Sequence, residues 1–173
     1  MNKDINSLLK RYPKKRRPLS KELKKIFNEE YSKNRANFLS QLSESWMHLS
    51  IKGRKSKKKN STLEVGAGSL NHIKYEGPNN LHKYNIIEPQ KFLLRNNKFL
   101  KKVKIYKNIN QIKKGSLDRI ISTAVLEHMI ELPKFLASSS KFLKKDGYHS
   151  HSIPCEGYPL WHLMWDIVSG IPF

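Results

Sequence analysis

The sequence has little of two features that place proteins in particular classes. It contains one cysteine, Cys155, so no disulfide forms within the chain, and a reducing, cytoplasmic compartment is the expected location. It also lacks long apolar runs, because stretches such as Tyr84–Ile87 and Ile120–Leu126 are far shorter than the roughly 18–20 residues that cross a bilayer. No apolar segment follows the basic N-terminus. The sequence therefore predicts neither a membrane span nor a signal peptide.

Acidic residues are scarce, and so is arginine. The chain has 14 Asp and Glu against 34 Lys and Arg, which gives a net charge of +20. Residues 1–59 hold 18 of the basic residues and only 5 of the acidic ones. Lysine outnumbers arginine by 27 to 7, whereas specific readers of bases and phosphates favour the forked guanidinium of arginine. An AT-rich genome also raises lysine without selection for function, so a nucleic-acid partner is not favoured.

The 173 residues suit one globular domain, with 38% hydrophobic and 28% charged residues. Residues 1–18 are expected to be a basic flexible tail, because prolines bracket Tyr12–Pro18 and prevent a helix there. Residues 19–59 are expected to form a helical cap, with Ser20 as an N-cap and a second helix over Phe38–Ile51, followed by a basic linker. Residues 60–173 have a different texture and are expected to form an α/β domain.

Strands and helices alternate along this third region. The expected strands are Ser61–Val65, Tyr84–Ile87, Val103–Tyr106, Ser116–Ser122 and Tyr148–Ile153. The expected helices are Ser69–Tyr75, Lys91–Leu100, Leu132–Leu143, which Asp146-Gly147 would stop, and Leu160–Ser169. Such alternation is typical of parallel βαβ units, and right-handed crossovers then produce a doubly wound parallel sheet.

The residues that follow the first two strands indicate a ligand site, because ligands of such sheets bind at the carboxyl ends of the strands. Gly66 and Gly68 form a G-x-G turn, but Asn71 stands where a dinucleotide fingerprint needs glycine or alanine. Glu64 precedes the turn, and its carboxylate favours a cationic ligand over a pyrophosphate. Glu88 ends the second strand, 22 residues after Gly66, where a carboxylate accepts hydrogen bonds from the hydroxyls of a ribose.

Five motifs occur in one order along the chain. They are Glu64–Gly68 (EVGAG), Ile86–Pro89 (IIEP), Leu117–Ser122 (LDRIIS), Val125–His128 (VLEH) and Leu143–Gly147 (LKKDG). Over about residues 20–173 this series resembles class I S-adenosylmethionine-dependent methyltransferases, and most of all the branch named methyltransferase type 11. Ser152–Gly157 (SIPCEG), with Trp161 and Trp165, resembles a subgroup associated with bacterial surface-polysaccharide gene clusters.

The resemblance implies a Rossmann-like sheet of strand order 3-2-1-4-5 with N-terminal helices, and S-adenosyl-L-methionine as cofactor. The cofactor-binding positions that it implies are Glu64, Gly66, Ala67, Gly68, Glu88, Asn108, Ile109, Thr123 and Ala124, together with Tyr31 and Arg35 on the upstream helix. Asn108 and Ile109 would flank the adenine. Thr123 and Ala124 would line the methionine side, and Arg35 would pair with the methionine carboxylate. For Tyr31 and Arg35, a place at the helix surface and the edge of the core is the open alternative.

Catalysis of methyl transfer requires a base only where the acceptor must lose a proton. His128 is the candidate, with Glu127 and Glu156 behind it, although Glu127-His128 ending a turn is the alternative reading. His149 and His151 share one face of a strand, but no further ligand cluster accompanies them, so no metal is expected.

Relatives continue beyond the position where this sequence ends, so the final β-hairpin is expected to be missing. The fifth strand would then be an exposed edge that favours self-association. The leading functional hypothesis is methyl transfer to a small-molecule acceptor, including a sugar or surface-polysaccharide precursor. The alternative is a catalytically impaired methyltransferase-fold remnant that acts as a basic module binding nucleic acid or protein. Whether the short chain is active is left open.

Overall fold

The computed structural model describes residues 3–11, 18, 20–23, 25–26, 38–53, 58–95 and 97–154. The chain forms two compact units, of which the larger comprises residues 1–14 and 48–153 and the smaller comprises residues 15–47 and 154–173. All the strands described below belong to the larger unit. Among the described residues, no helix has both the length and the apolar composition that a bilayer crossing needs.

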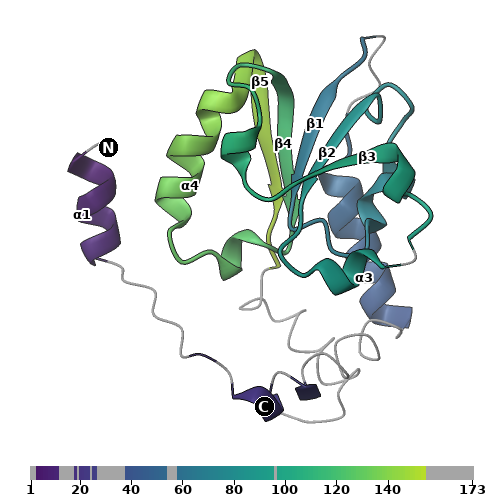
Figure 1. The fold of residues 1–173 in the computed structure, drawn as a ribbon, viewed down its shortest axis with the longest axis horizontal. Coiled ribbons are helices and arrows are strands. Elements are labelled where there is room, and N and C mark those ends of the chain that lie inside the picture. Colours follow the sequence, from purple (N-terminus) through teal and green to yellow (C-terminus); the bar gives the residue numbers. More distant parts are fainter. Residues whose placement is uncertain are drawn as a thin grey trace. The chain divides into compact units, whose positions relative to one another are not determined.

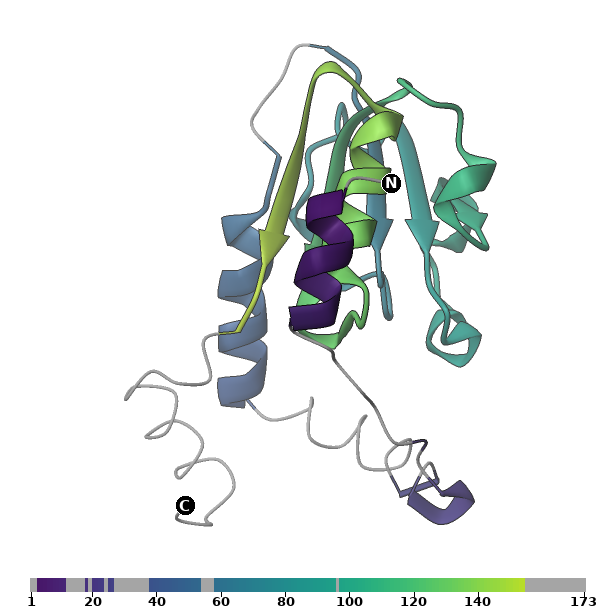
Figure 2. The same ribbon diagram turned by 90° about the vertical axis from the view of Figure 1, so that its left-hand side faces the viewer.

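The larger unit is built on a five-stranded sheet in which each neighbouring pair of strands is parallel (Figure 1). The strands are β1 (Ser61–Val65), β2 (Lys83–Ile87), β3 (Val103–Tyr106), β4 (Leu117–Thr123) and β5 (Leu143–Ser152). Their order is β3-β2-β1-β4-β5, which confirms the predicted doubly wound arrangement. All five arrowheads end at the same edge of the sheet (Figures 1 and 2), which we name the carboxyl edge.

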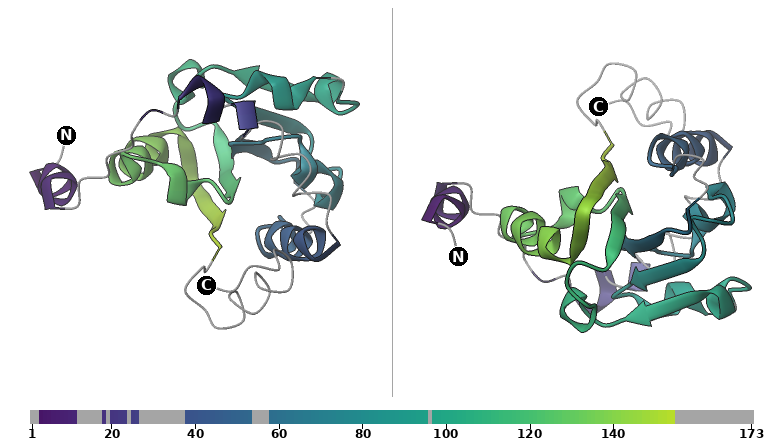
Figure 3. Two further views of the ribbon diagram at one scale, coloured as in Figure 1. Left: turned by 90° about the horizontal axis from the view of Figure 1, so that it is seen from below. Right: turned by 90° about the horizontal axis from the view of Figure 1, so that it is seen from above.

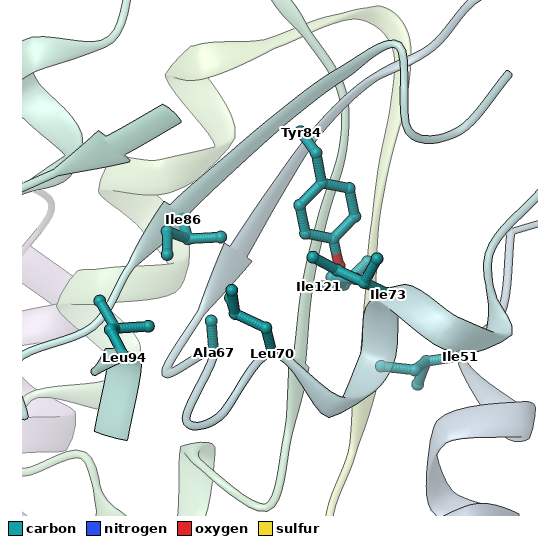
Figure 4. Close-up of a cluster of buried hydrophobic side chains, with 8 residues drawn as sticks. All are labelled: Ile51, Ala67, Leu70, Ile73, Tyr84, Ile86, Leu94 and Ile121. Atoms are coloured by element: carbon teal, nitrogen blue, oxygen red, sulfur yellow. The ribbon is translucent and has the colours of Figure 1, made fainter. Parts of the chain in front are cut away.

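Helices cover both faces of the sheet (Figure 3). Helix α4 (Leu132–Ser139) lies on one face, and the 3-10 helix η1 (Asn71–Tyr75) lies on the other with the last turn of α3 (Phe38–Ser50). Each face has its own apolar cluster. The cluster on the α4 side is Leu63, Val65, Ile112, Leu117, Ile120 and Phe142. The cluster on the η1 side is Ile51, Ala67, Leu70, Ile73, Tyr84, Ile86, Leu94 and Ile121 (Figure 4).

Several helices differ from the sequence prediction. Lys3–Arg11, placed in the flexible tail, is helix α1, with Asp4 in its first turn and Lys10 and Arg11 in its last, as a helix dipole favours. The predicted helix over residues 91–100 is instead two short 3-10 helices, η2 (Lys91–Leu94) and η3 (Leu100–Lys102). The side chain of Asn97 lies between them, donating to the carbonyl of Ser69 at 2.6 Å and accepting from the Phe99 amide at 2.9 Å. These side-chain bonds compete with a continuous helix.

The fourth helix and the fifth strand meet earlier than predicted. Helix α4 ends at Ser139, the 3-10 helix η6 (Ser140–Phe142) follows, and β5 already begins at Leu143. Gly147, expected to stop a helix, lies inside β5 at a register irregularity opposite Leu117 and Arg119. An added Cβ there would lie 2.9 Å from the carbonyl oxygen of Leu117, so the close approach to β4 requires glycine. Elsewhere, the Leu23 amide donates to Ser20 Oγ at 3.1 Å, which agrees with the predicted N-cap.

A buried ion pair lies on the η1 side of the sheet. Arg119 of β4 is 0% exposed, and its Nη2 donates to Glu76 Oε1. Its Nε donates to Thr62 Oγ1 of β1 at 2.9 Å, and Asn80 Nδ2 donates to Glu76 Oε2 at 2.8 Å. Burial acts to raise the pKa of Glu76, but the hydrogen bond from His72 and the charge of Arg119 outweigh it and hold the pKa at about 2.

Glu76→Gln is expected to destabilise the fold by about 3–5 kcal/mol, because it leaves the buried guanidinium without its anion. Urea unfolding at neutral pH measures the change. Glu131→Gln is the matched control, since Glu131 is exposed and pairs with the exposed Lys134 at 3.1 Å, where an ion pair contributes at most about 1 kcal/mol. Equal free energies of unfolding for the two variants would show that the buried pair is unimportant.

Candidate functional site

The turn after β1 brings the backbone to the carboxyl edge without side chains in the way. Gly66 has a φ of +68°, and its amide donates to the carbonyl of Ile87 at 2.8 Å. A Cβ on Gly66 would lie 2.5 Å from Cγ2 of Val125, so the neighbouring β4 turn also requires glycine here. Gly68 has a φ of +51°, and none of the described atoms lies within 4 Å of its ideal Cβ position. The backbone at Gly68 therefore has room for a ligand.

Glu88 joins this turn to the end of β2. Its side chain is largely buried, Oε2 accepts from the amide of Gly68 at 2.7 Å, and Oε1 accepts from the amide of Gln90 at 2.7 Å. A carboxylate has about four lone-pair sites, so two amide donors leave acceptor capacity for a ligand. The structure thus brings together the two features that the sequence spacing singled out. Contact with a ribose stays a prediction.

The other strand ends contribute unequally. Thr123 ends β4, and Ala124 follows it with a φ of +52° while its amide donates to the carbonyl of Ser152 at 2.9 Å. Asn108 is exposed after β3, where its Oδ1 accepts from the amide of Asn110 at 3.1 Å and caps η4 (Ile109–Gln111). Ile109 packs against the apolar cluster on the α4 side. The side chain of Ala67 belongs to the core on the η1 side, so this residue offers a ligand only its backbone.

Glu64 lies beneath the turn and is 2% exposed. Tyr84 Oη of β2 donates to Glu64 Oε2 at 2.9 Å. Burial raises the pKa of Glu64 to about 8, despite the opposing hydrogen bond from Tyr84. The carboxyl group therefore holds its proton at neutral pH, and it lacks the negative charge on which the sequence argument for a cationic ligand depended. The role of Glu64 in cofactor binding stays a prediction.

The candidate base is solvent-accessible. His128 belongs to the 3-10 helix η5 (Leu126–His128) just after β4, its side chain is 65% exposed, and its Nε2 lies 3.9 Å from Glu127 Oε1. Its position after β4 is the one that the sequence motif implied. The remaining predicted residues lie outside the described part of the chain: Tyr31, Arg35 and Glu156, together with Cys155, Trp161 and Trp165.

His149 and His151 share one face of β5, as predicted. Nδ1 of His149 lies 3.2 Å from Nε2 of His151, and Nδ1 of His151 lies 2.8 Å from Ser122 Oγ. Burial lowers the pKa of both imidazoles, that of His151 to about 4. Within the ranges that the structure describes, no three His, Cys, Asp or Glu side chains gather as metal ligands would.

Sequence reasoning missed the polar side chains behind the edge. His48 and His72 are buried, and Nδ1 of one lies 3.2 Å from Nδ1 of the other. His48 Nδ1 also lies 3.3 Å from Thr123 Oγ1. The one available signal was local: His72 and Glu76 are four residues apart, which indicated a pair on a helix but not its burial.

No protein-family model matches the chain, and no curated protein matches it either. Solved structures do. One is the complex between the Haloferax volcanii Trm112 methyltransferase activator and a methyltransferase, with a TM-score of 0.55, 10% identity, and coverage of 73% of this chain and 58% of that one. Another is an S-adenosyl-L-methionine-dependent methyltransferase from Methanococcus maripaludis, with a TM-score of 0.52, 12% identity, and coverage of 92% and 73%.

The chain thus spans 58% of the first neighbour and 73% of the second. At such low identity the likeness concerns the fold. Together with the observed strand order, it shows that this chain has the Rossmann-like fold of class I S-adenosylmethionine-dependent methyltransferases.

Glu64→Gln is expected to stabilise the protein increasingly as the pH rises. In the wild type the folded state keeps the Glu64 proton up to about pH 8, whereas the unfolded state releases it near 4.5. Wild-type stability therefore falls across that window by up to about 1.4 kcal/mol per pH unit, and the glutamine variant avoids this loss. Melting temperatures from pH 4 to pH 9 give the difference between the two proteins.

Glu131→Gln removes an exposed carboxylate and serves as the control, with a difference from wild type that stays small at every pH. A Glu64→Gln difference that is flat from pH 4 to pH 9 would mean that Glu64 is ionised in the folded state.

Proposed function

We propose that the chain binds S-adenosyl-L-methionine at the carboxyl edge and transfers its methyl group to a small-molecule acceptor. The observation that carries the proposal is the junction of Gly68 and Glu88, where an open backbone turn and a carboxylate with remaining acceptor capacity meet 2.7 Å apart. This combination fits a nucleoside whose ribose hydroxyls need acceptors and whose close approach excludes a Cβ. The distant likeness to methyltransferase structures supports the same assignment.

The residues of this chain act mainly by binding and orientation. The cofactor supplies a methyl group already activated on a sulfonium, so the protein has to align it with the acceptor. Glu88 accepts hydrogen bonds from the ligand while Gly68 and Gln90 hold its carboxylate in place. Val125 packs against Gly66 and so fixes the β4 turn relative to the β1 turn. Where the acceptor is a hydroxyl or amine that must lose a proton, His128 takes that proton on a ring nitrogen.

The acceptor class follows from the motif resemblance. The stretch that begins at Ser152 is similar to that of a subgroup associated with surface-polysaccharide gene clusters, which favours a sugar or a polysaccharide precursor. A sugar hydroxyl has a high pKa, so methyl transfer to its oxygen benefits from a base such as His128 that takes the proton.

Glu88→Ala is expected to weaken the binding of S-adenosylhomocysteine by about 30- to 1000-fold, which corresponds to about 2–4 kcal/mol for two charge-assisted hydrogen bonds. Calorimetric titration measures the affinity. Glu131→Ala, with the same change of charge at an exposed site, is expected to bind as the wild type does. The assignment is wrong if Glu88→Ala binds as tightly as its control, and the proposed function is wrong if the wild-type protein does not bind.

A second candidate function rests on the edge of the sheet opposite the carboxyl edge, which we name the amino edge. Among the described residues, ten exposed lysines stand just before or at the first residues of the five strands: Lys58, Lys59, Lys83, Lys101, Lys102, Lys113, Lys114, Lys141, Lys144 and Lys145. Asp118 and Asp146 are the partly or fully exposed acids of the same segments, and Asp118 accepts from Lys144 Nζ at 2.8 Å. Lysines gathered in this way suit phosphates without sequence readout, so we infer duplex nucleic acid as the ligand of a non-catalytic module.

Replacing Lys101, Lys102, Lys113 and Lys114 with Gln tests this candidate. A matched variant replaces Lys74, Lys91, Lys98 and Lys107, which are exposed lysines elsewhere. If the amino edge binds a duplex, only the first variant loses affinity, by at least about tenfold, and its dependence on salt becomes shallower because fewer counterions are released. Anisotropy of a labelled RNA duplex between 50 and 200 mM salt, roughly the range in which such contacts weaken, measures both. Equal losses in both variants would indicate attraction to net charge alone.

A further inference from the structure

A hydrogen-bond network of polar side chains runs from the carboxyl edge into the core of the larger unit. Thr123 Oγ1, at the end of β4, lies 3.3 Å from His48 Nδ1 in the last turn of α3. His48 Nδ1 lies 3.2 Å from His72 Nδ1 in η1, and His72 Nε2 lies 2.7 Å from Glu76 Oε1. His48 is 5% exposed and His72 is 0% exposed. Both rings are therefore shielded from solvent, and their contacts are with other side chains.

The direction of these hydrogen bonds follows from Glu76, the innermost group of the network. Glu76 is ionised, with its pKa held at about 2, so His72 Nε2 must donate to it. Burial lowers the pKa of His72, which leaves the ring neutral with a single N–H. Because that hydrogen is on Nε2, Nδ1 of His72 is an acceptor. Nδ1 of His48 must therefore carry a hydrogen and donate it.

The same hydrogen determines what Thr123 offers. The Nδ1–H of His48 lies within reach of both His72 Nδ1 and Thr123 Oγ1, so the threonine oxygen accepts from it. A hydroxyl that accepts in this way keeps its own hydrogen for another partner. Thr123 is partly exposed at the carboxyl edge, where its hydroxyl is within reach of a bound ligand.

We propose that His48 and His72 are positioning residues that fix the Thr123 hydroxyl as a hydrogen-bond donor to an acceptor oxygen of the ligand bound at the carboxyl edge. The inference rests on the proposed function, because it takes the ligand to be S-adenosylmethionine or its demethylated product. His48 and His72 are the new elements, since no cofactor motif in the sequence assigned them.

Protonation of His72 reverses the direction of its hydrogen bond with His48. If His72 becomes an imidazolium, both of its nitrogens donate, so His48 Nδ1 has to accept and can no longer donate to Thr123 Oγ1. The Thr123 hydroxyl is then no longer held as a donor to the ligand. Among the described residues, the ring of Tyr75 stacks on His48 with centroids 5.2 Å apart, and the ion pair of Glu76 with Arg119 adjoins His72. Because burial lowers the pKa of His72, the reversal occurs on the acid side of the usual imidazole range. Ligand affinity should fall there.

The first test compares two variants of the full 173-residue chain. Thr123→Val removes the hydroxyl at nearly constant shape and is expected to weaken S-adenosylhomocysteine about 5- to 15-fold at neutral pH, the usual effect of one hydrogen bond. Thr123→Ser keeps the hydroxyl and is expected to bind within about twofold of wild type. The affinity of wild type and of Thr123→Ser should fall on the acid side, and that of Thr123→Val should vary less with pH.

The second test reads the imidazoles without any ligand. Long-range ¹⁵N–¹H NMR spectra of the unliganded protein should show His48 as the Nδ1–H tautomer and His72 as the Nε2–H tautomer. A double-mutant cycle then joins the two residues: His48→Leu and Thr123→Val together should weaken binding no more than Thr123→Val alone. Melting temperatures show which variants are folded. If His48→Leu does not fold, the comparison of Thr123→Val with wild type still decides the test.

The outcomes separate the two proposals. If the wild type does not bind S-adenosylhomocysteine, the proposed function is wrong and this inference goes with it. If the wild type binds and Thr123→Val binds equally well, or Thr123→Ser is as weak as Thr123→Val, the inference alone is wrong. The opposite tautomers would also overturn it.

Discussion

A positive charge buried in the middle of the sheet constrains the rest of the larger unit. Arg119 lies on β4, 0% exposed, and a guanidinium cannot give up its charge in a protein. Its anion has to reach it from another element, and Glu76, just after η1, does so. Thr62 on β1 accepts from Arg119 Nε. The pair therefore fixes η1 against the sheet beside the β1–β4 junction. Space is tight as well, since a Cβ on Gly53 would lie 2.5 Å from Arg119 Nη1.

The strands were predictable wherever a short run with β-branched and other apolar residues met a turn signal. The bounds of β1 and β3 agree with the prediction. Strand β1 is short and buried, and β3 is short and flanked by lysines and a turn. The stretch 91–100 was not predictable, because a bond from Asn97 to Ser69, 28 residues away, interrupts the helix. The start of β5 was missed for a related reason. Asp146-Gly147 is a strong local stop signal, and only the neighbouring backbone of β4 explains a glycine inside a strand.

The candidate site also has features that could be predicted from the sequence and features that could not. The meeting of Gly68 with Glu88 followed from spacing alone, because the carboxyl ends of parallel neighbouring strands lie at one edge. The protonation of Glu64 did not, since it depends on complete burial beside Tyr84 on another strand. The sequence suggested a charged acid near the ligand, and the fold produces a neutral one. His48 and His72 are 24 residues apart, and neither belongs to a motif whose period places it at a site.

Stability and the polarity of the site depend on one carboxylate. Glu76 accepts from Arg119, His72, Asn80 and the amide of Gly53, which are four donors for about four lone-pair sites. The charge that neutralises the guanidinium is therefore the same charge that orients the hydrogen of His72. A substitution at Glu76 would change both properties at once, and its effect on a ligand could not be separated from its effect on folding. Thr123 lies at the other end of this hydrogen-bond network, where the hydrogen-bond direction can be altered while the ion pair stays intact.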